Sequence, residues 1–131
     1  MRIWGIRSGV NTSENLAVKS WEARTPLMAV TSSGEGTRLP PLQNGIAVSS
    51  KGVLVTAFGH DPDGNRGTLL RLWEEAGKTG TVTITLPVGK TFSKAKPVNL
   101  RGEASGKPVN IVNGKFSCAI KAFGPDSFIL E

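Results

Sequence analysis

A chain of 131 residues with a net charge of +6 and 38% hydrophobic residues is long enough to bury one core, so we expect residues 1–131 to form a single domain. Its 16 glycines and 8 prolines favour short strands joined by many turns over long helices. No apolar stretch reaches the roughly 20 residues that a membrane-spanning helix needs. The lysines are scattered singly along the chain, so neither a membrane nor a nucleic acid is the expected partner. A basic nucleic-acid binder stays the weaker alternative.

The first third of the chain has weak patterns. Residues 2–7 alternate enough to predict a strand, and residues 16–21 predict a second one because apolar positions alternate there. The first residues lack the apolar segment of a signal peptide, and the cellular compartment stays undetermined. Residues 31–45 contain adjacent prolines and are interpreted as a loop or a connection between sheets.

From Gly45 onward, short apolar runs alternate with turn residues. This spacing is typical of an all-β fold, an antiparallel β-sandwich of seven to nine short strands. The predicted strands cover residues 46–49, 53–58, 68–74, 81–86, 92–100, 109–112, 116–120 and 127–130.

The sharpest pattern is GTLLRLWEEAGKTGTVTITLP, residues 67–87. Its second half alternates threonines with aliphatic residues, which predicts a strand that buries the aliphatic face. Its first half predicts a strand with Leu70 and Leu72 on one face. Since only a few residues with two glycines separate the halves, we expect a central β-hairpin. A second hairpin is expected at Asn113-Gly114.

The loop GHDPDGNRG, residues 59–67, is the one cluster that looks chemical. Asp61, Asp63 and Asn65 stand at alternate positions, as in a calcium loop. Arg66 occupies the place where an EF-hand has glycine. We therefore interpret the loop as an ordinary turn, with calcium as the alternative. A single histidine and a single cysteine do not supply a zinc ligand set, and we expect no metal site.

Sugar binding is a further possibility, because large aromatic side chains can stack on sugar rings. The candidate carbohydrate-binding residues are Trp4, Trp21, His60, Asp61 and Asp63. The competing interpretation places the tryptophans in the core or in an interface.

The run LLRLWEEAGKTGTVTITLP, residues 69–87, resembles a signature near the end of glycoside hydrolase family 38 α-mannosidases. In that family a Leu-Arg-Leu-aromatic-Glu strand precedes a glycine-containing turn and an alternating strand. Arg71, Trp73 and Glu74 match the structural signature, with Trp73 where an aromatic, often Tyr, is usual.

The resemblance implies a non-catalytic C-terminal β-sandwich, of the immunoglobulin-like or galactose-mutarotase-like accessory type, that packs on and supports a catalytic part. The partners would be missing N-terminal domains of the same polypeptide. Zinc is implied only for that catalytic domain, so no cofactor and no catalytic residue carries over to this chain. A stand-alone carbohydrate-binding module is the alternative.

Arg71 has a prediction of its own. It lies inside a strand with Leu69 and Trp73 on its face, and we expect that face to be covered. A covered guanidinium needs a partner, and the suggested carboxylates are Glu22 and Glu103. Exposure of Arg71 is the alternative.

Overall fold

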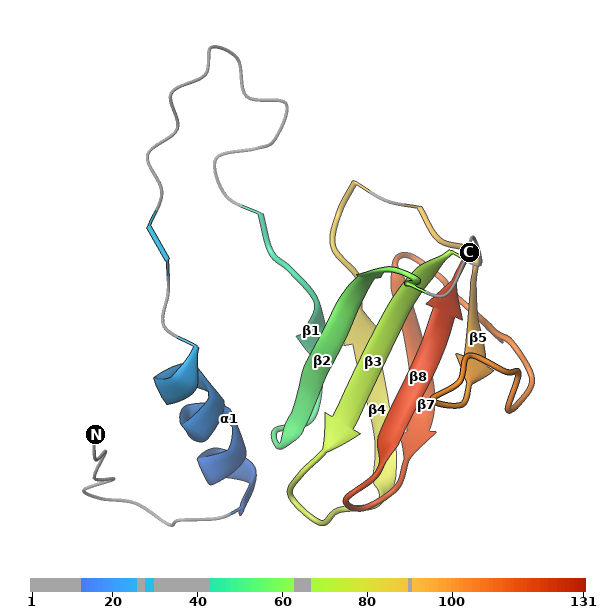
Figure 1. The fold of residues 1–131 in the computed structure, drawn as a ribbon. Coiled ribbons are helices and arrows are strands. Elements are labelled where there is room, and N and C mark those ends of the chain that lie inside the picture. Colours follow the sequence, from blue (N-terminus) through green and yellow to red (C-terminus); the bar gives the residue numbers. More distant parts are fainter. Residues whose placement is uncertain (1–12, 26–27, 30–42, 63–66, 90) are drawn as a thin grey trace.

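The computed structural model describes residues 13–25, 28–29, 43–62, 67–89 and 91–131. In this part of the chain one helix precedes eight strands (Figure 1). The helix does not satisfy the criteria of length and apolarity for crossing a membrane. The elements are α1 (Ser13–Arg24), β1 (Ala47–Val48), β2 (Val53–His60), β3 (Thr68–Glu74), β4 (Gly80–Thr85), β5 (Lys94–Val98), β6 (Val109–Asn110), β7 (Lys115–Ile120) and β8 (Pro125–Leu130).

The strands form two antiparallel sheets, of order β1-β4-β7 and β2-β3-β8-β5-β6. Figure 1 shows the smaller sheet behind the larger one. The predicted antiparallel β-sandwich is therefore confirmed. Each sheet buries one face, because successive side chains in a strand point to opposite sides.

The core lies between the sheets and is almost entirely aliphatic and aromatic. Leu70 and Leu72 of β3 and Ile84 of β4 are completely buried. The rings of Phe116 and Phe128 meet edge to face, with their centroids 5.3 Å apart. Each such side chain contributes about 1.5–3 kcal/mol when it is fully buried. The alternation predicted for β4 is confirmed, with its threonines on the outer side.

The predicted hairpin between residues 68–74 and 81–86 is wrong. β3 pairs with β2 and β8, whereas β4 pairs with β1 and β7. The short connection between β3 and β4 carries the chain from one sheet to the other. Both strands bury an aliphatic face against the same core, and a two-residue sequence period records only the buried face. It does not distinguish strands that pair from strands that face each other.

The second predicted hairpin is only partly present. Asn113 and Gly114 have φ values of 51° and 70°, as a tight type I′ turn requires. Val112 and Lys115 exchange two backbone hydrogen bonds, of 2.9 and 3.0 Å. Beyond that bridge β6 joins the larger sheet and β7 the smaller one, so the turn acts as a corner between the sheets.

Residues 16–21, predicted as a strand, lie in α1, so that prediction is wrong. The helix as a whole contains Leu, Ala, Lys, Glu and Arg, which are intrinsically good helix formers. Its apolar residues form no sustained helical stripe, and short alternation therefore suggested a strand. The strand predicted at residues 2–7 lies outside the described residues, as does most of the loop predicted at residues 31–45.

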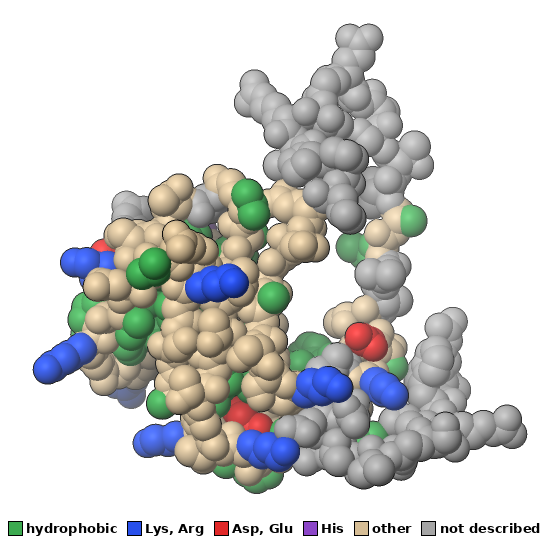
Figure 2. All heavy atoms as spheres, turned by 180° about the vertical axis from the view of Figure 1, so that it is seen from behind, with side chains coloured by type: hydrophobic (Ala, Val, Ile, Leu, Met, Phe, Trp, Pro, Cys, Tyr) green, Lys and Arg blue, Asp and Glu red, His purple; other side chains and the backbone are tan. Residues whose placement is uncertain are grey.

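The outer face of the smaller sheet is rich in hydroxyl groups. Thr81, Thr83 and Thr85 of β4 lie on it, and the Thr83 and Ser117 hydroxyl oxygens are 2.9 Å apart. Figure 2 views the molecule from this side and shows basic side chains standing singly around its margin. The face is thus largely neutral and polar.

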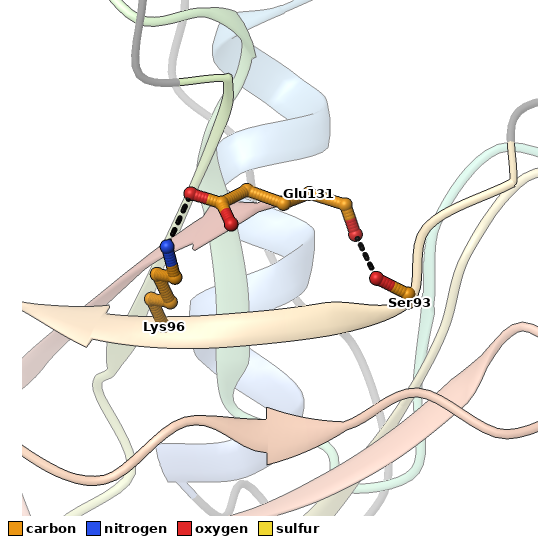
Figure 3. Close-up of polar contacts among 3 residues, drawn as sticks. All are labelled: Ser93, Lys96 and Glu131. Carbon is orange, nitrogen blue, oxygen red and sulfur yellow. Dashed lines mark hydrogen bonds and ion pairs between the residues drawn. The ribbon is translucent and has the colours of Figure 1, made fainter.

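Glu131 is fastened to β5 (Figure 3). Its carboxylate accepts a 2.6 Å bond from Lys96 Nζ, and its carbonyl accepts a 3.1 Å bond from the Ser93 hydroxyl. The Lys96 and Glu131 side chains are 44% and 42% exposed. Such an exposed ion pair contributes at most about 1 kcal/mol, so the backbone pairing of β8 with β5 provides most of this connection.

Candidate functional site

Glu74, the last residue of β3, is a charged side chain inside the sandwich. It is 1% exposed. Its Oε1 accepts a hydrogen bond from Ala76 N–H, and its Oε2 accepts hydrogen bonds from Gly77 and Phe123 N–H, all at 2.9 Å. One carboxylate therefore joins the β3–β4 crossover to the turn before β8. We call Glu74, Ala76, Gly77 and Phe123 the Glu74 clasp.

The protonation of Glu74 follows from these contacts. Burial is the largest effect and raises the pKa, but the backbone N–H groups of Phe123, Lys78, Ala76 and Gly77 together outweigh it and hold the pKa below 4.5. Hydrogen bonds to the charged form favour ionisation. Glu74 is thus an anion at neutral pH with its oxygens engaged by backbone donors, which suits a structural role better than proton transfer.

The clasp also holds an unusual backbone. Phe123 has a φ of 55°, a left-handed conformation that is costly for a bulky residue. Its ring lies on Gly77, where an added Cβ would come within 2.6 Å of the ring Cζ. The Phe123 side chain nevertheless stays 68% exposed. Its N–H bond to Glu74 is a direct restraint on this strained turn.

Arg71 has a hydroxyl partner. Its Nε donates a 3.0 Å hydrogen bond to Ser127 Oγ, and register places the two residues opposite each other on β3 and β8. Arg71 is half-buried and Ser127 is buried, so the predicted covered face is partly covered. Neither suggested carboxylate is its partner in the described contacts: Glu103 accepts a 2.7 Å bond from Asn99, and Glu22 lies on α1.

Trp73 lies on the outer face of the larger sheet and is 41% exposed. Register aligns it with Leu54 of β2 and Pro125 of β8, and both of these residues are half-buried. The three residues form an apolar row across three neighbouring strands, which we call the Trp73 row.

The residues suggested for sugar binding fall in separate places. Trp21, on α1, is 42% exposed. His60 is exposed at the end of β2, and its Nδ1 lies 2.9 Å from the Asp61 carbonyl oxygen. Asp61 is 4% exposed, and its N–H donates a 3.1 Å bond to the Gly67 carbonyl. Trp4 and Asp63 lie outside the described residues.

Trp21 lines a hollow of about 220 Å³ between α1 and the first half of β2. His60 lies four residues beyond Thr56 on β2, about 13 Å farther along the strand, and Figure 1 shows α1 beside the opposite end of that strand. Trp21 is therefore not joined with His60 and Asp61 in one site. The residues that line the hollow are Trp21, Glu22, Thr25, Leu54, Val55 and Thr56.

The next candidates for chemistry among the described residues are metal ligands and the Cys118 thiol. These residues include no group of three His, Cys, Asp or Glu that would hold a metal ion. Burial, followed by the nearby Asp126 charge, raises the pKa of Cys118 to about 11. Burial raises the pKa of Asp126 in turn, although Lys121 counteracts it. Cys118 therefore remains a thiol at neutral pH, and only the thiolate is a strong nucleophile.

Sequence reasoning singled out Glu74 but not its partner Phe123, which lies 49 residues farther along the chain. Gly124-Pro125-Asp126 predicts a turn, but the left-handed residue of that turn is Phe123, and β8 already begins at Pro125. Comparisons of the chain with protein-family models, curated proteins and solved structures found no match.

Proposed function

We propose that this chain is a non-catalytic accessory β-sandwich of an α-mannosidase-like glycoside hydrolase, where it packs on and supports the catalytic part. The observation that carries the proposal is the stretch 69–87, which resembles the signature of that family. Its three signature residues have separate tasks in the fold. Arg71 bonds to β8, Glu74 closes the clasp, and Trp73 remains at the surface.

The Trp73 row supplies the contact surface in this proposal. Aromatic side chains are enriched in protein interfaces, and Trp73 keeps 41% of its surface exposed. The partner is the set of N-terminal domains of the same polypeptide. The resemblance also implies that the zinc ion and an aspartate nucleophile would belong to those domains.

The test uses the polypeptide that the surrounding gene encodes. We expect Trp73→Ala to lower the temperature at which α-mannosidase activity is lost, and Thr81→Ala, an exposed position on the other sheet, to leave it unchanged. A gene without a His- and Asp-bearing catalytic domain would overturn the proposal. So would turnover of an aryl α-mannoside by the isolated chain with zinc.

The hollow beside Trp21 favours a second candidate, a stand-alone carbohydrate-binding module. It combines an exposed indole with the side chains of Glu22, Thr25 and Thr56. Titration with mannose-containing oligosaccharides should then shift the NMR signals of Trp21, and Trp21→Ala should abolish binding while Trp73→Ala preserves it. Unchanged spectra at millimolar sugar would exclude this candidate.

A further inference from the structure

In the part of the chain that the structure describes, the sandwich has four edge strands, β1 and β7 in the smaller sheet and β2 and β6 in the larger. Native sheets protect their edges with short strands, lysines or prolines, because an open edge recruits other strands. β1 and β6 have only two residues each, and β7 contains a lysine, Lys115, at its first position. These three edges are protected.

β2 differs from the other edges. It has eight residues, VLVTAFGH, with no Lys, Arg, Asp, Glu or Pro. Its first half lines the hollow beside α1, and a register shift between Val55 and Ala57 interrupts its pairing. Beyond the shift, β3 is the one strand paired with β2 in the described part of the chain. There Phe58 is 39% exposed, and Gly59 and His60 are exposed.

The hydrogen bonds of the β2–β3 pair show which backbone groups face outward. Asp61 N–H donates to Gly67 O, so residue 61 faces β3. Residues along an antiparallel strand alternate between facing one neighbour and facing the other. Gly59 therefore also faces β3, while Phe58 and His60 direct their N–H and C=O groups to the free edge.

We propose that this edge pairs with the same edge of a second copy of the chain, antiparallel about a two-fold axis at Gly59. Phe58 of each copy then exchanges two backbone hydrogen bonds with His60 of the other, and the two larger sheets become continuous. Phe58 and His60 lie on either side of Gly59, so a two-fold rotation about Gly59 places Phe58 of each copy opposite His60 of the other. This self-complementarity is what a two-fold interface requires.

The surroundings of the proposed axis permit the approach. A Cβ added to Gly59 would meet no atom within 4 Å, so the face of the sheet is open at the proposed axis. The eight residues of β2 include no Lys, Arg, Asp or Glu, which limits like-charge repulsion between copies with a net charge of +6. The Phe58 ring, on the core-facing side with its register partner Leu70, would lie beside His60 of the second copy.

The direct test is sedimentation equilibrium of the whole chain from about 10 µM to 1 mM, because a few hydrogen bonds give weak association. We expect the mass to rise toward twice 13.8 kDa. Hydrogen exchange at the Phe58 and His60 amides should slow at high concentration, whereas exchange at Gly59, already bonded to β3, should stay constant. This alternation separates strand pairing from other association.

Two variants probe the edge in different ways. Phe58→Lys places a charge at the edge and His60→Pro removes one outward N–H, and each should reduce association at least about tenfold. Their matched controls, Thr81→Lys and His60→Ala, should associate like the native chain. Circular dichroism checks that each variant is folded. If one of the two edge variants does not fold, the other is sufficient for the test.

Any one of four results would overturn the inference. One is a native chain that stays monomeric over the whole concentration range. Another is association that both edge variants retain, since it would use a different surface. The third is protection that Gly59 gains together with its neighbours. The fourth is association that Thr81→Lys weakens as much as Phe58→Lys does.

Discussion

Replacing Glu74 with Gln tests whether the clasp depends on a charged acceptor. The amide has the same shape, but its NH₂ group must occupy the place of one carboxylate oxygen. At the Oε2 position it would face the N–H donors of Gly77 and Phe123, which both bond there at 2.9 Å. Two bonds to a charged acceptor would then be lost, and each is worth about 1.5–3 kcal/mol.

We expect Glu74→Gln to lower the free energy of unfolding by about 3 kcal/mol, because the amide can turn its oxygen toward some of the donors. Urea denaturation at pH 7 measures the change. Glu75→Gln is the matched control: Glu75 follows β3 directly and is half-buried, and the change should alter stability by less than about 0.5 kcal/mol. A Glu74→Gln midpoint equal to the native one would refute the structural role of the charge.

The same clasp predicts a pH dependence. The folded-state pKa of Glu74 lies below 4.5, so the unfolded state binds the proton more tightly. The contribution of Glu74 is complete above the unfolded pKa and is lost as the pH falls through the folded one. Native stability should therefore drop below about pH 4.5. In Glu74→Gln that drop should be smaller, and equal drops in both proteins would argue against the assignment.

Three further predictions concern backbone strain, the Arg71 contact and the thiol. Gly77→Ala should cost about 1–2 kcal/mol in urea denaturation, because Gly77 has a φ of 77° that an alanine adopts with strain. A midpoint equal to the native one would contradict this. Arg71→Ala should lower the free energy of unfolding by about 1 kcal/mol, since Arg71 Nε bonds to the neutral hydroxyl of Ser127. Arg71→Lys should recover only part of this loss. A urea midpoint of Arg71→Ala equal to the native one would show that the contact does not stabilise the fold. Cys118 should react with a thiol reagent at pH 8 much more slowly in the folded chain than in urea, because burial raises its pKa to about 11, and equal rates would contradict its burial.

Most of the strand positions were predictable because their signal is local. The alternation of Val82 and Ile84 with threonines gave both the strand and its buried face, and the turn at Asn113-Gly114 was correctly located. The pairing of strands does not depend on such a local signal. The face of Leu70 was right although its predicted partner strand was wrong, because alternation states what is buried and not what lies beside it.

The candidate site was less predictable because its parts are distant in sequence. The role of Glu74 depends on the N–H of Phe123 in another turn, and the partner of Arg71 is a serine on β8. A hydroxyl or a backbone donor leaves no distinctive pattern in one sequence. The strand prediction for Trp21 is wrong because a short alternation of apolar residues also occurs within a helix and does not by itself indicate a strand.

The position of β8 has a consequence for folding kinetics. β8 lies between β3 and β5 in the larger sheet and pairs Leu130 with Thr68. Without β8, β2 and β3 would form one two-stranded ribbon and β5 and β6 another, and isolated two-stranded ribbons are marginal in water. The larger sheet is therefore completed by pairing between segments that are distant in the chain. The conformational entropy of the intervening residues is lost before the stabilising core contacts form. Folding should accordingly occur in milliseconds to seconds, as in other sandwiches of high contact order.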